Sequence, residues 1–142
     1  MKNELLIRVS GVQKDDKGEE NKIQLTTEGV IYKKSNSIFI VYRESEISGM
    51  EGTTTTLKIE GDNRVSLKRY GSNQAFMVFE KGKRCKSPYN TLFGNFQMEV
   101  YTNNLEVNIC EDFRHGDIDI SYNLRILGLV ETSNSLNISF KA

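Results

Sequence analysis

Two charged side chains, a carboxylate and a guanidinium, occupy otherwise apolar faces of predicted strands. Glu44 alternates in step with Tyr42, and Arg69 alternates in step with Leu67. A charge that points inward is costly unless it is paired or hydrogen-bonded. Glu44 and Arg69 therefore either bridge each other inside the fold or form the polar end of a cavity, where Arg69 meets an anionic group of a ligand.

Strand direction brings these side chains to one end of the predicted fold. Short turns reverse the chain, so the end of one strand lies beside the start of the next. The end of Ile38–Glu44, the start of Thr53–Glu60 and the end of Val65–Arg69 then meet at one mouth. Either face of Ile38–Glu44 could point inward, because Phe39 and Val41 make the face opposite to Glu44 apolar as well. The candidate ligand-binding residues at this mouth and in the upper cavity are Tyr42, Glu44, Thr55, Arg69, Met77, Tyr89 and Thr91.

Other side chains that could support catalysis lie in turns or on outward faces. His115, the single histidine, falls in the predicted turn Arg114–Asp117, where its ring would meet solvent. Asp117 and Asp119 alternate with isoleucines and point outward, where carboxylates solvate a surface rather than exchange protons in a cleft. We therefore expect no catalytic residues and a protein that is not an enzyme.

Metal and redox chemistry also lack a matching pattern. The charged loop Lys14–Asn21 has neither the ligand spacing of an EF-hand nor flanking helices. Cys85 and Cys110 fit no zinc spacing and are too few for a disulfide framework. We therefore expect no metal and no cofactor, and two free thiols.

A basic cluster, Lys81–Arg84 with Lys86, lies at a predicted hairpin between Phe79 and Tyr89. Basic and aromatic side chains together suit single-stranded nucleic acid. The chain nevertheless carries 19 Lys and Arg residues against 19 Asp and Glu residues, for a formal net charge of zero. Nucleic acid is therefore not expected as a partner, because such binders present a basic face.

Apolar residues recur with a period of two along most of the chain, as in half-buried β-strands. Thr53–Glu60 is a clear example, and no long window shows a helical apolar stripe. Polar clusters between the strands predict turns at Thr102–Asn104, Arg114–Asp117 and Thr132–Ser135, among others. The sequence predicts one all-β domain over residues 1–142, an antiparallel meander of about 8–11 strands that closes into a barrel.

The spaced strand positions resemble the YwiB-like family of small bacterial proteins over nearly the whole chain. The resemblance is densest at Tyr42-x-Glu44 with Glu46 and Gly49, Thr53–Leu57-x-Ile59, Val65-x-Leu67-x-Arg69-x-Gly71, Met77–Phe79, Gly82, Tyr89-x-Thr91, Gly94 and Gly116-x-Ile118-x-Ile120-x-Tyr122 with Asn137. It implies a closed calycin-type (lipocalin-like) barrel of unassigned function. Calycin relatives often bind small, largely apolar molecules, which is an analogy of fold.

The leading hypothesis is a cytoplasmic barrel that binds a small molecule in its interior, near the mouth formed by Glu44 and Arg69. The short N-terminal apolar run, interrupted by Arg8, indicates neither a signal peptide nor a transmembrane helix, so no membrane partner is expected. The alternatives are a protein-interaction module with a filled barrel and a weak binder of single-stranded nucleic acid. Either a monomer or a homodimer is compatible with the sequence.

Overall fold

A computed structural model describes residues 3–44, 51–71, 74–91 and 94–142, without the side chains at 3, 90 and 91. In these ranges the regular secondary structure consists of β-strands alone, so no helix there could cross a membrane. The ten strands are β1 (Asn3–Asp15), β2 (Glu20–Lys34), β3 (Ser37–Arg43), β4 (Thr53–Glu60), β5 (Arg64–Gly71), β6 (Ala75–Glu80), β7 (Arg84–Thr91), β8 (Gly94–Ile109), β9 (His115–Ile126) and β10 (Val130–Lys141).

All ten strands belong to one antiparallel sheet in the order β6-β5-β4-β3-β2-β1-β10-β9-β8-β7. The ladder between β1 and β10 joins the two ends of the chain, from Leu6 opposite Lys141 to Asp15 opposite Thr132. β6 and β7 are the two sheet edges, although they follow one another in sequence. The result is a nearly closed barrel, which confirms the predicted all-β meander.

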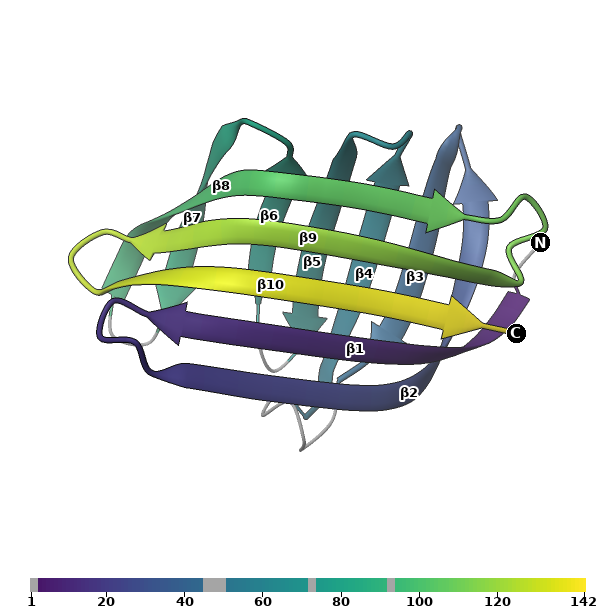
Figure 1. The fold of residues 1–142 in the computed structure, drawn as a ribbon, viewed down its shortest axis with the longest axis horizontal. Coiled ribbons are helices and arrows are strands. Elements are labelled where there is room, and N and C mark those ends of the chain that lie inside the picture. The colour runs from purple at the N-terminus through teal and green to yellow at the C-terminus, as the bar shows by residue number, and fades with distance from the viewer. Residues whose placement is uncertain (1–2, 45–50, 72–73, 92–93) are drawn as a thin grey trace.

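The barrel is flattened into two layers whose strands cross (Figure 1). β1, β2, β8, β9 and β10 run across the front of the view, and β3–β6 run behind them at a steep angle. β2 belongs to both layers, because it pairs with β1 along most of its length and with β3 at its end. Gly29 lies at this bend, opposite both Leu5 and Tyr42, and a glycine there allows the backbones to come close.

The space between the layers holds the hydrophobic core. The strict alternation of buried and half-buried residues in Thr53–Glu60 shows the predicted period of two. On β3 the inward face carries Ile40 and Tyr42, while Phe39 lies outside and stacks on Tyr32 with 5.2 Å between ring centroids. The largest fully buried side chains are Phe79, Ile7, Ile31, Ile40, Leu57, Ile59, Leu67, Ile118, Ile120, Ile138, Val65 and Val100.

Three predicted turns are wrong. Thr102–Asn104 is a β-bulge inside the continuous strand β8, because one strand absorbs the extra residue without ending. Thr132–Ser135 lies within β10, and the turn comes earlier, where Gly128 has a φ of 82°. Arg114–Asp117 is not a turn, because β9 begins at His115 and the chain already turns between Cys110 and Phe113. Most of the polar residues at these positions lie within strands, two of them (Thr102 and Thr132) buried, and only their composition resembles that of a turn.

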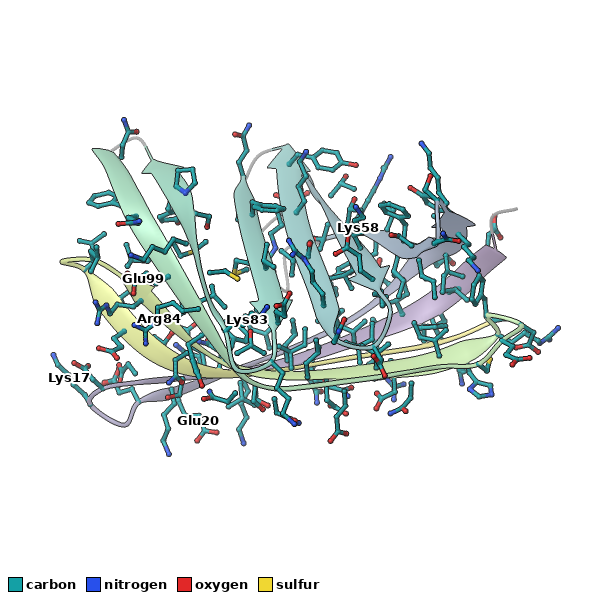
Figure 2. All side chains as sticks on the ribbon, turned by 90° about the horizontal axis from the view of Figure 1, so that it is seen from above. Lys17, Glu20, Lys58, Lys83, Arg84 and Glu99 are labelled. Carbon is teal, nitrogen blue, oxygen red and sulfur yellow. The ribbon has the colours of Figure 1, made fainter. Side chains whose placement is uncertain are left out.

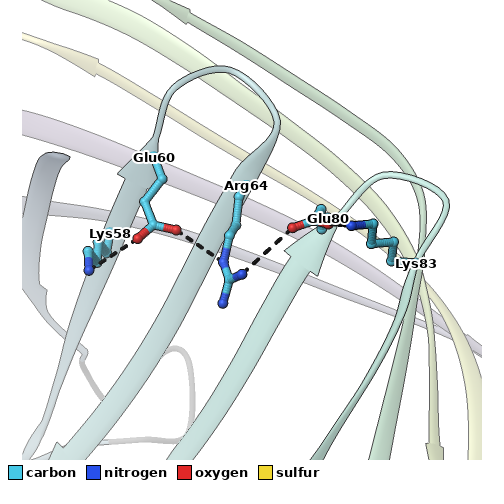
Figure 3. A network of polar contacts seen from close by, with 5 residues as sticks. All are labelled: Lys58, Glu60, Arg64, Glu80 and Lys83. Atoms are coloured by element: carbon cyan, nitrogen blue, oxygen red, sulfur yellow. Dashed lines mark ion pairs between the residues drawn. The ribbon is translucent and has the colours of Figure 1, made fainter. Parts of the chain in front are cut away.

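Charged side chains project outward around the barrel (Figures 2 and 3). Lys17 and Glu20 point away at the β1–β2 hairpin. On the back layer a chain of ion pairs crosses three strands and the next hairpin, from Lys58 through Glu60, Arg64 and Glu80 to Lys83. These pairs are largely exposed, so each adds only a small stabilisation and is screened by salt.

Candidate functional site

A cavity of about 490 Å³ lies between the two layers and opens toward the β1–β2 hairpin. Its wall is mostly apolar. Glu44 and Arg69 lie where β3 and β5 end, and the other polar lining residues besides the tyrosines come from β1, β2 and β10. The lining residues are Val9, Gly11, Val12, Gln13, Asn21, Lys22, Ile23, Leu25, Tyr42, Glu44, Arg69, Met77, Tyr122, Leu124, Asn134, Ser135 and Leu136.

The polar end is built by the register of three neighbouring strands. Thr55 on β4 lies opposite Tyr42 on β3 and opposite Arg69 on β5. The Thr55 hydroxyl donates a hydrogen bond of 2.7 Å to Glu44 Oε1. Arg69 Nε lies 3.8 Å from the same oxygen. The structure therefore brings Glu44, Thr55 and Arg69 together at one end and on one face, as strand direction and parity predict.

The Glu44–Arg69 pair is loose and asymmetric. The Glu44 side chain is 3% exposed, whereas that of Arg69 is 21% exposed. Arg69 Nε is buried and has no hydrogen-bond partner within the described part of the chain. A buried donor without an acceptor is costly, so this nitrogen favours an acceptor supplied from the cavity.

Two tyrosines, Tyr42 and Tyr122, line the cavity together with Arg69. Burial, and then the nearby Glu44 carboxylate, raise the pKa of Tyr42 well above its ordinary value, while Arg69 and a hydrogen bond with Thr55 act in the opposite direction. Burial also raises the pKa of Tyr122, against the opposing effect of Arg69. Both phenols stay neutral at physiological pH and can donate hydrogen bonds.

The predicted site residues divide into three groups. Tyr42, Glu44, Arg69 and Met77 line the cavity. Thr55 does not line the cavity; it is fully buried and donates a hydrogen bond to Glu44. Two further residues from the prediction do not contribute to the described lining: Tyr89 packs against the hydrophobic core instead, and the side chain of Thr91 lies outside the described residues.

The opposite wall was not predicted from the sequence. It comes from β1, β2, β9 and β10, which supply Val9, Leu25, Tyr122, Leu124 and Leu136. Their alternation predicts inward faces, but parity along single strands does not show how the two layers cross. Tyr122 could have been singled out, since it continues the inward face of Ile118 and Ile120.

The remaining chemical candidates are engaged in surface contacts. The Asn137 amide donates to both Asp117 and Asp119, over 2.9 and 2.6 Å, and His115 is exposed. The Cys110 thiol donates to Asp112 over 2.7 Å, which lowers the pKa of that carboxyl. Among the described residues, no group of three His, Cys, Asp or Glu side chains could hold a metal ion.

Much of the predicted basic cluster is also paired. Lys83 forms an ion pair with Glu80, and Lys86 lies 3.6 Å from Glu99. Arg84 lies over the ring of Tyr101, with 5.8 Å from the guanidinium carbon to the ring centroid. These contacts are those of a solvated sheet surface.

Comparison with known proteins assigns the chain to a family. Residues 7–138 match the family model described as "Domain of unknown function (DUF1934)". The chain belongs to this DUF1934 family. A curated relative, "Uncharacterized beta-barrel protein YwiB" of Bacillus subtilis (strain 168), is 24% identical over 137 residues, which are 96% of this chain and 92% of the relative.

A solved structure agrees with the fold of this DUF1934 chain. The crystal structure of ywiB protein from Bacillus subtilis matches with a TM-score of 0.84 at 22% identity, covering 99% of this chain and 92% of that chain. The predicted YwiB-like resemblance is thereby confirmed. The chain is thus a β-barrel protein of a family whose function is unassigned.

Proposed function

We propose that this protein binds a small organic molecule inside the barrel, in a role that involves binding and no catalysis. The observation that carries the proposal is the cavity of about 490 Å³, with a mostly apolar wall and the Glu44–Arg69 pair on one side. Small-molecule sites in proteins commonly enclose roughly 300–1,000 Å³ and have this division of apolar wall and polar anchor.

The electrostatics of the polar end support the same proposal. Arg69 Nε is buried beside the cavity without a hydrogen-bond acceptor from the described residues. Its ion pair with Glu44 is longer than a hydrogen-bonded pair. A bound polar group or an ordered water would offset the cost of that donor.

A protein-interaction module is less well supported. That alternative calls for a filled interior, whereas this barrel has a cavity between its layers that opens to solvent. The exposed apolar residues at the β9–β10 turn, Leu127, Leu129 and Val130, are its best supporting feature. The nucleic-acid alternative is weakened because Lys83 and Lys86 are paired with carboxylates.

The setting of this function is also a proposal, and it rests on the sequence. We propose a cytoplasmic protein that acts as a monomer or homodimer, without a cofactor and without a membrane partner. Cell fractionation tests the location, and light scattering of the purified protein tests the oligomeric state.

Filling the cavity tests the proposed binding. Gly11 lines the cavity, and a Cβ built on it would lie 4.0 Å from the nearest atoms, which is ordinary contact. We expect Gly11→Val to fold and to abolish binding, because its side chain occupies ligand space. Ser10→Val, at the neighbouring position that does not line the cavity, is the matched control.

The readouts are native mass spectrometry of freshly purified protein and a thermal-shift screen of a chemically mixed small-molecule library. The wild type and Ser10→Val should retain a co-purified mass or show the same stabilising compounds, and Gly11→Val should lose them. Equal thermal shifts in all three proteins would place binding outside the cavity and overturn the proposal.

A further inference from the structure

The geometry points to the chemical class of the ligand: an amphiphilic monoanion, with one carboxylate-type headgroup on a compact apolar body. The inference rests on the proposed function and deepens it. It assigns the headgroup to Arg69 and the apolar body to the wall formed by residues such as Leu25 and Leu136.

Charge balance at the cavity favours an anion. The ionised side chains in its described lining are Lys22, Arg69 and Glu44. Lys22 is exposed at the entrance, where water screens its charge, and the interior pair of Arg69 and Glu44 is balanced. Tyr42 and Tyr122 stay neutral because burial raises the pKa of each phenol. The exposed Lys22 therefore gives the entrance a weak positive bias, which favours an anionic ligand over a cationic one.

The positions of Glu44 and Arg69 favour an anion for a second reason. Glu44 lies deeper, and one of its oxygens already accepts the Thr55 hydroxyl proton. Arg69 is the more exposed partner, and its buried Nε has no acceptor in the described structure. A guanidinium offers donors in a planar fork that matches a carboxylate. A ligand therefore meets the guanidinium before it meets the carboxylate.

Tyr122 adds a neutral donor beside that fork. Its ring packs on Phe79 with 4.8 Å between centroids, so the side chain is held in place by the core. Tyr122 and Arg69 both line this cavity. Arg69 and Tyr122 together can donate to the two oxygens of one headgroup.

Cavity size limits the apolar body. A volume of about 490 Å³ holds roughly 16 groups of the size of a water molecule, at about 30 Å³ each. This space fits one short alkyl chain or a small ring system with a headgroup. It does not fit a lipid with two long chains.

Three matched probes with the same alkyl chain test the headgroup. Decanoate, decylamine and decanol are titrated into the protein by isothermal calorimetry at neutral pH, each below its micellar concentration. We expect decanoate to bind roughly ten- to a hundredfold more tightly than decanol, because a charge-assisted hydrogen bond supplies that margin. Decylamine should bind more weakly than decanol.

Variants at the polar end then assign the headgroup to Arg69. Arg69→Gln should remove the preference for decanoate over decanol, and Arg64→Gln, on the same strand at the outer surface, should preserve it. Glu44→Gln should tighten decanoate binding, since Arg69 loses its competing carboxylate. This last variant keeps the test decisive if Arg69→Gln fails to fold.

Each outcome bears on the inference. Decanol or decylamine binding as tightly as decanoate would overturn the anion assignment, while cavity binding itself would stand. Weaker decanoate binding in Glu44→Gln would also overturn it. Failure of all three probes rejects the amphiphilic monoanion, whereas the library screen with Gly11→Val decides separately whether the cavity binds a molecule at all.

Discussion

At the scale of single residues, the interior carboxylate depends on its neighbours. Glu44 is almost fully buried, and its described partners are the Thr55 hydroxyl at 2.7 Å and the Arg69 guanidinium at 3.8 Å. Removing one partner of a buried charge destabilises a protein strongly, because the charge stays desolvated and loses the contact that compensated for it. The shorter of the two contacts should therefore dominate the stability of this end of the barrel.

Thr55→Val tests this dependence. Valine keeps the shape of threonine and its preference for a strand, but it cannot donate to Glu44. We expect the free energy of unfolding to fall by about 1.5–3 kcal/mol, the range for a hydrogen bond to a charged group. Thr54→Val, at the neighbouring half-buried position, is the control and should change stability by less than about 0.5 kcal/mol. Equal effects of the two substitutions in urea denaturation would show that the Glu44 contact is energetically unimportant.

The buried phenol of Tyr42 makes the free energy of unfolding depend on pH in the alkaline range. Burial raises the pKa of its phenol in the folded protein above the ordinary value of 10.0. The folded chain therefore keeps a proton that the unfolded chain releases above pH 10. Stability is full below that pH and declines as the pH rises further.

We expect Tyr42→Phe to reduce this alkaline loss, because it removes the buried phenol and keeps the ring. Urea denaturation of the variant and the wild type at neutral pH and above pH 10 measures the difference in slope. Tyr70→Phe, at a position 47% exposed, is the matched control. An alkaline decline as steep in Tyr42→Phe as in the wild type would contradict the prediction.

At the scale of elements, strand parity predicted much of the cavity's polar end and little of its apolar wall. Glu44 and Arg69 could be placed because β3, β4 and β5 are consecutive hairpins with fixed registers. Phe39 left the face of β3 ambiguous, and its stacking on Tyr32 outside the barrel explains why an apolar residue lies there. The wall from β1 and β10 depends on a pairing between distant parts of the chain, which local patterns do not specify.

Turn signals failed where polar residues serve the interior of a strand. In β10 the Asn134 amide donates a hydrogen bond of 2.9 Å to Thr132 Oγ1, a local bond of the kind found in turns. The backbone pairing of β10 with β9 nevertheless continues through these residues. In β8 the bulge at Thr102–Asn104 keeps both flanking segments paired with β9. Composition alone does not separate a bulge from a turn, because both use the same small polar residues.

The bend of β2 leaves no room for a side chain at Gly29. A Cβ at this position would lie closer to the Ile7 side chain and to the Val41 carbonyl oxygen than real Cβ atoms come. We expect Gly29→Ala to destabilise the fold by about 1–3 kcal/mol, since the backbone of β3 must move. Gly11→Ala, where the same atom meets only ordinary contacts, is the control. Thermal and urea denaturation of both variants measure the difference, and equal stability would show that β2 and β3 can separate at no cost.

At the scale of the whole molecule, the barrel has a seam between β6 and β7. The sheet order begins with β6 and ends with β7, so these two strands share no ladder in the described structure. The hairpin turn joins them at one end, where Gly82 N donates to Thr102 O over 2.8 Å. Along the strands, the Ser87 hydroxyl donates to the Phe76 carbonyl over 2.9 Å. Pro88 and Lys86 on β7 are residues that protect an exposed edge from pairing with other chains.

The seam should be the first part of the barrel to open. Amide protons at sheet edges lack a ladder partner and exchange through small local openings, whereas those of central strands exchange only on larger unfolding. We expect native-state hydrogen exchange to be fastest, within the strands, at the outer edges of β6 and β7, and slowest in β1, β9 and β10. Ser87→Ala removes the described side-chain bond across the seam and should speed exchange in β6 while β1 stays unchanged. Ser139→Ala, on β10, is the control, since β10 is paired on both sides. Equal protection of β6 and β10 would mean that β6 and β7 behave in solution as a paired, fully closed barrel wall.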